Sequence, residues 1–212
     1  MGISKNAISL TEKIYEVLKE EIINAELRGG DLLTEIELAQ RFQVSKTPVR
    51  EALTRLKNEG FAEVIPCKGY MISNISFREM KELFQLRYAL EMGSMELVLS
   101  LATDNDIAAL EQVARDILPV NDESSYRYYL AQNYKFHIRL AECTQNAKIC
   151  SVLENVMNQL NRVLLLDWDT VEAEYIRNEH LEVVEALKSR DPALYSEKLK
   201  KHIEETRKRI FR

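Results

Sequence analysis

Apolar residues recur at helical intervals over most of this chain. Within residues 9–26 the apolar side chains fall three or four positions apart, and the RGGD sequence at 28–31 is expected to end that helix. From Phe77 onward the spacing is helical throughout, with no strand pattern and no internal repeat. Polar turn sequences divide this second part into six expected helices, at 77–102, 104–118, 123–143, 146–168, 171–189 and 191–211.

The region between these helices has shorter elements. Thr34, with Glu37 three positions later, is typical of a capping box that begins a short helix. Ser45 is expected to cap a second short helix, which ends at Gly60. The runs FAEVIP and YMISNI then flank CKG and predict a hairpin of two strands. Helices followed by such a hairpin predict a winged helix-turn-helix.

Together the two patterns predict a mainly α protein with two domains. Residues 1–75 would form the winged helix-turn-helix and residues 76–212 an all-α domain of six helices, with a short polar joint at 74–76. The chain has 212 residues, 46% of them hydrophobic, and only six Gly and four Pro. This composition is sufficient for real cores and argues against an all-β fold.

The sequence also argues against a membrane-spanning protein and against a secreted one. No apolar run approaches the roughly 18 residues that a membrane-spanning helix needs, and the first residues lack the apolar segment of a signal peptide. The three cysteines, Cys67, Cys143 and Cys150, form no CxxC pair and are expected to be reduced thiols. We therefore expect a cytoplasmic protein.

The charge of the whole chain gives no indication of nucleic-acid binding, because its net value is −5. A binding surface needs only a local excess, however. Between Arg41 and Lys68 there are six basic and three acidic residues, a local charge of +3. This mild excess coincides with the short helices and the hairpin.

The helix that follows Ser45 has two different faces. One face is apolar and consists of Val49, Ala52, Leu53 and Leu56. The neighbouring face is polar and consists of Lys46, Arg50, Thr54 and Lys57. The first turn of such a helix can enter the major groove, where Arg50 can donate two hydrogen bonds to guanine. The alternative is a solvated basic face, but the capped helix before it and the hairpin after it favour DNA binding.

The segment LLTEIELAQRFQVSKTPVREALTRLKNEGFAEVIPCKGYMIS resembles the DNA-binding domain of GntR-type bacterial transcription regulators, over roughly residues 9–73. The resemblance implies a homodimer on a palindromic operator. One position departs from the family pattern, since Ile36 stands where Arg is common, so we expect a different operator preference. The candidate DNA-binding residues are Glu35, Ser45, Lys46, Thr47, Pro48, Arg50, Lys68 and Gly69.

All three histidines of the chain lie on apolar helix faces. His137, His180 and His202 belong to three different expected helices, and Asn133 lies four residues before His137 on the same face. A single histidine in such a place is most often a core residue bonded to a carbonyl or a water. Three inward imidazoles in one helical domain also fit a site for a divalent transition metal, with the Asn133 oxygen as a fourth ligand.

An all-α domain behind a GntR-type head resembles the FCD class, named for the C-terminal domain of FadR. The stretches NYKFH, NEHLEVVEAL and LKKHIEE match its metal-binding positions, which implies Asn133, His137, His180 and His202 as ligands. Asn133 stands where the class usually has Asp, so all four ligands would be neutral. The implied cofactor is a divalent transition metal, zinc first, with nickel and manganese as alternatives.

Arg87 is a charged residue among apolar neighbours, and it needs a partner if it is buried. Two interpretations are open: an ion pair with Glu91 one helical turn later, or a fork that binds a small carboxylate effector beside the metal. The resemblance favours the effector.

Three functions remain open from the sequence. The first is a DNA-binding regulator controlled by a small organic acid near a metal. The second is a metalloenzyme, for which no carboxylate is found at a spacing that would serve as a general base. The third is a regulator whose histidines are purely structural and whose effector binds without metal. The first is preferred, because a DNA-reading domain is a poor fit to catalysis.

Overall fold

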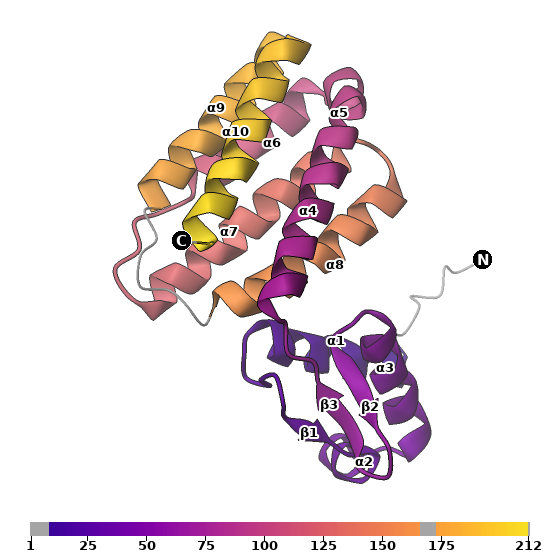
Figure 1. Cartoon of the computed structure of the whole chain (residues 1–212). Coiled ribbons are helices and arrows are strands. Elements are labelled where there is room, and N and C mark those ends of the chain that lie inside the picture. The colour runs from indigo at the N-terminus through magenta and orange to yellow at the C-terminus, as the bar shows by residue number, and fades with distance from the viewer. Residues whose placement is uncertain (1–8, 166–172, 212) are drawn as a thin grey trace, which may run out of the picture. The chain divides into compact units, whose positions relative to one another are not determined.

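The computed structural model describes residues 9–165 and 173–211, and the chain divides into two compact units between Ser76 and Phe77. The first unit contains α1 (Leu10–Ile23), β1 (Leu32–Leu33), α2 (Glu35–Phe42), α3 (Lys46–Asn58), β2 (Ala62–Ile65) and β3 (Gly69–Ile72). This is the predicted winged helix-turn-helix (Figure 1). None of the described helices is long and apolar enough to cross a membrane.

The sheet of the first unit has one strand more than predicted. β3 lies in the middle and pairs antiparallel with β2 and with β1, in the order β1-β3-β2. Where β1 meets β3, Gly69 has φ +120°, and a Cβ there would lie 2.5 Å from the Leu33 carbonyl oxygen. Gly69 is therefore required by the sheet itself, whatever its role toward DNA.

The two short helices begin differently. Thr34 caps α2 as predicted: its hydroxyl accepts from the Glu37 N–H at 3.2 Å and donates to the Glu37 carboxylate at 2.7 Å. Ser45 occupies the cap position of α3, but its hydroxyl makes no capping hydrogen bond, so this part of the prediction is wrong. The reason is local, because Pro48, at the third helical position, has no N–H to donate.

The core of the first unit lies where α1 packs on α3. Buried residues of α1 meet the predicted apolar face of α3: Ile14, Tyr15, Leu18, Ile22, Val49, Ala52, Leu53 and Leu56. Tyr15 also donates to the Glu59 carboxylate at 2.6 Å, which joins α1 to the end of α3. This packing leaves the opposite, polar face of α3 exposed.

The described part of the second unit is all-helical. Its helices are α4 (Phe77–Gly93), α5 (Met95–Leu101), α6 (Asp104–Arg115), α7 (Glu123–Glu142), α8 (Ala147–Leu164), α9 (Ala173–Ser189) and α10 (Pro192–Ile210). The expected helix 77–102 is divided into α4 and α5 at Ser94, so seven described helices replace the predicted six. Two predicted ends, 166–168 and 171–172, lie outside the described residues.

The long helices of this unit pack around a common core. α7 lies against α6 and α8, α9 lies against α6 and α10, and α4 packs on α8 and α10 (Figure 1). The largest core cluster draws buried residues from α5, α6, α7, α9 and α10, including Val98, Leu110, Phe136, Val183 and Leu199. Inward faces of α4, α7, α9 and α10 carry the polar residues described next.

Candidate metal centre and DNA-binding helix

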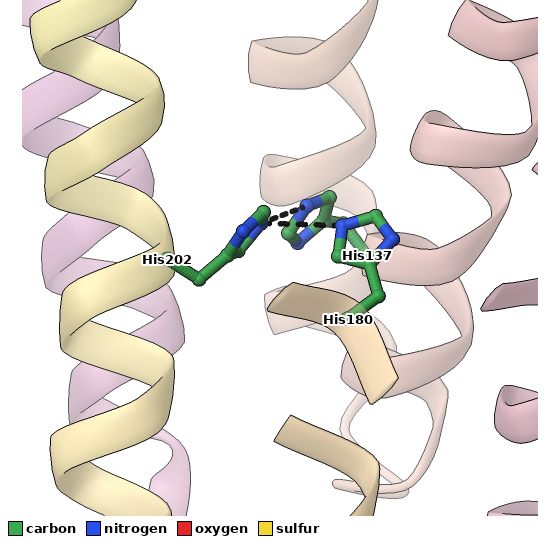
Figure 2. A group of neighbouring side chains, drawn as sticks. All are labelled: His137, His180 and His202. Atoms are coloured by element: carbon green, nitrogen blue, oxygen red, sulfur yellow. Dashed lines mark hydrogen bonds between the residues drawn. The ribbon is translucent and has the colours of Figure 1, made fainter. Parts of the chain in front are cut away.

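The three histidines come together inside the second unit. His137 extends from α7, His180 from α9 and His202 from α10, and all three are buried (Figure 2). Their Nε2 atoms converge: His202 Nε2 lies 3.2 Å from His180 Nε2 and 3.2 Å from His137 Nε2. Residues up to 65 positions apart thus present nitrogen atoms to one point.

This convergence fits the donor set of a divalent metal. Nitrogen ligands bind zinc at about 2.0–2.1 Å, so two of them on a tetrahedral ion lie roughly 3.3 Å apart. The observed separations of 3.2 Å agree with that value. These three histidines also form the only group of three or more metal-binding side chains of its kind among the described residues.

Buried carboxylates contact two of the imidazoles at Nδ1, the ring nitrogen that does not face the other histidines. His202 Nδ1 lies 2.9 Å from a Glu179 oxygen, and His137 Nδ1 lies 2.8 Å from a Glu91 oxygen. An ionised carboxylate can only accept, so each Nδ1 carries the proton and each Nε2 keeps its lone pair. Such carboxylate partners are usual behind metal-binding histidines, since they fix ring orientation and tautomer.

Sequence analysis did not assign these two carboxylates to the site. Glu91 was considered only as a partner for Arg87, and Glu179 was not considered. Sequence spacing indicated no carboxylate that could serve as a general base, whereas the fold places two carboxylates beside the imidazoles. The sequence did contain a signal, because each glutamate occupies the buried face of its helix. Glu91 lies four residues after Arg87, and Glu179 directly precedes His180.

The surroundings keep the three histidines neutral. Burial, followed by the charge of Arg87, lowers the pKa of His137 to about 3. Burial and the neighbouring rings lower the pKa of His180, and burial also lowers that of His202. A neutral imidazole is the form that binds a metal. Burial alone would raise the pKa of Glu91, but contacts with His137 and Arg87 hold it below its usual value, so it stays ionised.

His180 differs from the other two histidines. Its ring stacks on Phe136, with centroids 3.9 Å apart and planes 8° apart. Its Nδ1 is buried and has no hydrogen-bond partner among the described residues. Stacking on Phe136 therefore orients this ring, whereas carboxylates orient the other two. A buried imidazole nitrogen without a hydrogen-bond partner costs folding free energy, unless a favourable contact at the other ring nitrogen offsets that cost.

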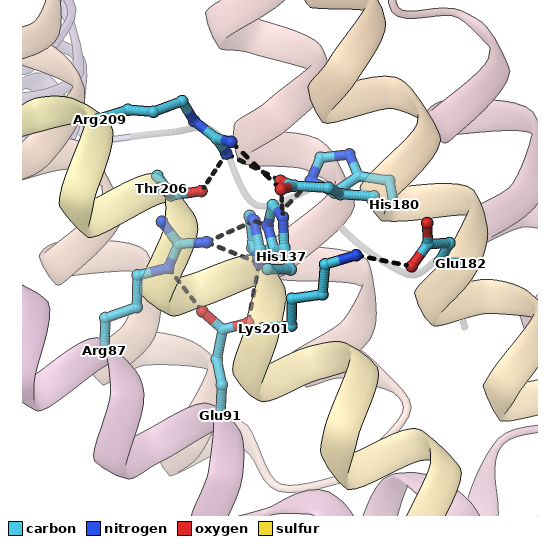
Figure 3. Close-up of polar contacts among 10 residues, drawn as sticks. Arg87, Glu91, His137, His180, Glu182, Lys201, Thr206 and Arg209 are labelled. Atoms are coloured by element: carbon cyan, nitrogen blue, oxygen red, sulfur yellow. Dashed lines mark hydrogen bonds and ion pairs between the residues drawn. The ribbon is translucent and has the colours of Figure 1, made fainter.

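Arg87 is buried within the same cluster. Its Nε donates to Glu91 at 2.7 Å, which is the ion pair considered in the sequence analysis (Figure 3). Its Nη2 also lies 2.5 Å from His137 Nε2 and 3.1 Å from His137 Nδ1. A second arginine, Arg209, donates to Glu179 at 2.8 Å. Each buried carboxylate thus contacts one imidazole and one guanidinium.

Asn133 is buried on α7, one helical turn before His137. Asn133 was predicted to lie on the same helix face as His137, and both residues are buried in the fold. Its role as a ligand remains a prediction.

A pocket of about 280 Å³ opens between α4 and α10. It is lined by Phe84, Gln85, Tyr88, Ile203, Glu204 and Arg207. Two of these, Tyr88 and Ile203, directly follow Arg87 and His202 in the chain. The volume is sufficient for a small organic acid.

In the first unit, most of the predicted DNA-binding side chains are accessible. Ser45, Lys46, Thr47, Arg50 and Lys68 are exposed. Glu35, Pro48 and Gly69 are partly buried. Their contact with DNA remains a prediction.

Arg50 has a partner that the sequence did not predict. Its Nε and Nη2 each donate to a Glu35 oxygen at 2.7 Å. This bidentate pair fixes the guanidinium at the start of α3, and a hydrogen bond from Arg50 lowers the pKa of Glu35. Glu35 therefore orients Arg50. This positioning role is an alternative to the predicted direct contact between Glu35 and DNA.

Comparisons with known proteins agree with this architecture. Residues 10–72 match the bacterial regulatory proteins of the gntR family, and residues 82–205 match the FCD domain. The chain belongs to the GntR family of transcription regulators, with an FCD domain. The predicted family and fold class are thus confirmed.

Relatives within the GntR family are similar over most of their length. The Nta operon transcriptional regulator of Aminobacter aminovorans is 31% identical over 171 residues, which cover 79% of each chain. The transcriptional repressor RspR of Escherichia coli is 25% identical over 92% of this chain and 86% of its own. The solved structure of E. coli McbR/YncC superposes with a TM-score of 0.77 over 97% of this chain and 98% of that one, at 21% identity, which supports the fold.

Proposed function

We propose that this GntR-family regulator binds a palindromic operator as a homodimer, and that a small organic acid bound beside a divalent metal in the FCD domain controls its operator affinity. The observation that carries the proposal is the convergence of three buried, neutral imidazole Nε2 atoms at 3.2 Å separations. As a protein that acts on the chromosome, it would work in the cytoplasm.

The metal would be held by His137, His180, His202 and Asn133. Zinc is the first candidate, with nickel and manganese as alternatives. When bound, the metal supplies a positive centre that attracts an anionic group of the effector. The histidines present lone pairs, Glu91 and Glu179 fix two of the rings, and Arg87 is the candidate that would bind the effector carboxylate.

The helix α3 supports the DNA-binding part of the proposal. Its first turn exposes Lys46, Thr47 and Arg50, and Arg50 is already held by two hydrogen bonds to Glu35. A guanidinium fixed in this way loses little freedom when it binds guanine. Phosphate contacts by Lys46 and Lys68 would position the domain without reading sequence.

An enzymatic role is disfavoured by the state of the nearby carboxylates. A general base beside a metal must be able to take up a proton. Glu91 and Glu179 are each engaged by one imidazole and one arginine, and both have a pKa below the usual value. Together with the relatives, which are regulators, this leads us to propose that the protein is not an enzyme.

The proposed function is tested by operator selection. Full-length protein is used to select duplexes from a random-sequence pool, and the binding of the selected duplex is then measured with zinc-loaded and with chelator-treated protein. We expect two half-sites related by a dyad, and an operator affinity that differs between the two protein samples. Selection of no specific sequence would contradict DNA recognition, and identical affinities would contradict control by metal.

Replacing Asn133 by aspartate is expected to tighten metal binding by at least about 10-fold. Mutation of a residue that only hydrogen-bonds to a metal ligand already changes metal affinity by about this factor. The reason is that aspartate would add a negative charge to three neutral histidines. In metal-free protein the same buried charge is expected to lower the melting temperature. The measurement is zinc affinity by competition with a chromogenic chelator, beside thermal unfolding.

The matched control is Asn158→Asp. Asn158 is equally buried, but it lies on α8, which carries none of the histidines. This variant should lose stability without gaining zinc affinity. An unchanged zinc affinity in Asn133→Asp, or an equal gain in both variants, would exclude Asn133 as a ligand position.

A further inference from the structure

Arg87 contacts the same nitrogen of His137 that faces the other two histidines. Its Nη2 lies 2.5 Å from His137 Nε2, while its Nε is held by Glu91 at 2.7 Å (Figure 3). The side chain is only 2% exposed, so this guanidinium is not a surface group that swings freely. It is a fixed part of the histidine cluster.

The direction of the hydrogen bond follows from the contacts around His137. Glu91 accepts the proton of His137 Nδ1 at 2.8 Å, so the neutral ring has its lone pair on Nε2. A guanidinium can only donate. Arg87 therefore donates an N–H to the lone pair of His137 Nε2, which is the lone pair that a metal would use.

The charges of the cluster lead to the same conclusion. Arg87 and Glu91 form a buried pair, and the partly exposed Arg209 pairs with the buried Glu179, so the cluster is balanced while the three imidazoles are neutral. Asn133 brings no compensating negative charge to the ligand set. A divalent cation next to a buried guanidinium would be poorly compensated.

We propose that Arg87 competes with the metal for His137 Nε2, so that the metal binds tightly only when the guanidinium has left this nitrogen. The proposal rests on the proposed function of the three histidines. It also connects the metal to the effector: an anion that binds the Arg87 guanidinium would free His137 Nε2. Because coupling between two ligands is reciprocal, metal and carboxylate would then strengthen each other's binding.

The pocket between α4 and α10 is the candidate binding place for such an anion. It is lined by Tyr88 and Ile203, the immediate neighbours of Arg87 and His202 in the chain, and by Arg207, a further cation. Glu204 of α10 also lines this pocket, so a carboxylate that entered there would meet one positive and one negative side chain, and Arg87 itself is not among the lining residues.

The test is zinc affinity, measured by competition with a chromogenic chelator in a carboxylate-free buffer. Arg87→Met keeps the length of the side chain and removes its charge and its donors. We expect this variant to bind zinc about 5- to 150-fold more tightly than the wild type, the usual range of coupling between sites. In Arg87→Met combined with Glu91→Gln, the glutamine oxygen still accepts from His137 Nδ1 and no unpaired buried charge remains, so the same gain is expected.

The matched control is Arg162→Met. Arg162 is also a buried arginine, but it lies on α8, which carries none of the three histidines. Its replacement should leave zinc affinity unchanged. If the wild type binds zinc and neither Arg87 variant binds it more tightly, the competition is excluded while the metal site stands. If the wild type and both variants fail to bind zinc, nickel and manganese, the metal site itself is excluded and the competition with it.

Discussion

Replacing His180 by alanine is expected to abolish tight binding of divalent metal. Even partners of metal ligands change affinity by about 10- to 100-fold when mutated, so the loss of a ligand should exceed about 100-fold. His180 is the most informative of the three histidines, because no carboxylate among the described residues holds it and its ring is oriented by stacking on Phe136. The measurement is isothermal titration of zinc, nickel or manganese into metal-free protein.

Phe136→Leu provides the control for packing. It disturbs the ring stack beside His180 but removes no nitrogen atom, so it should weaken metal binding far less than His180→Ala. Circular dichroism establishes that each variant is folded. Equal metal affinity of the wild type and a folded His180→Ala protein would mean that His180 is a core histidine and that the site must be sought elsewhere.

Replacing Arg50 by alanine is expected to weaken binding to the selected operator by about 1–3 kcal/mol, or roughly 5- to 150-fold. The guanidinium is exposed at the start of α3 and donates two hydrogen bonds to Glu35, so it can present its remaining donors to a base edge. Affinity for random DNA should fall less, because nonspecific binding depends on phosphate contacts. Fluorescence anisotropy with both duplexes at fixed salt measures the two effects.

Two controls separate recognition from charge. Arg78→Ala removes another exposed arginine that pairs with a glutamate, but in the FCD domain, and should leave operator binding unchanged. Arg50→Ala combined with Glu35→Gln removes the carboxylate that the single variant would leave without its partner. If operator affinity returns to the wild-type value in the double variant, Arg50 serves only to neutralise Glu35 and does not read a base.

Local patterns were sufficient to predict most of the fold. The apolar face of α3, the cap at Thr34 and the inward position of each histidine all depend on residues within a few positions of one another, where helical periodicity is informative. The break at Ser94 was not predicted, since the helical spacing continues across it. β1 was also missed, because two residues have no pattern of their own and Leu32 forms a strand only through its pairing with Met71.

The polar contacts of the candidate site depend on residues that are distant in the chain. Glu91 and His137 are 46 positions apart, and Glu179 and His202 are 23 apart, so no spacing rule joins them. The same applies to Arg87. Its pairing with Glu91 was considered from the sequence, but its contact with His137, 50 positions away, was not predicted. Sequence reasoning could identify the three histidines as candidate ligands, whereas the charges around them required the packing of α4, α7, α9 and α10.

The binding of a divalent metal by the three buried histidines is the basis of the proposed function. It is tested most directly by elemental analysis of untagged, full-length protein, purified without chelator and then dialysed against zinc, nickel or manganese and against metal-free buffer. We predict about one metal ion per chain, the stoichiometry of a single three-histidine site. If neither the wild type nor the Arg87→Met variant retains metal after any of these additions, the account is contradicted and the three imidazoles are core residues.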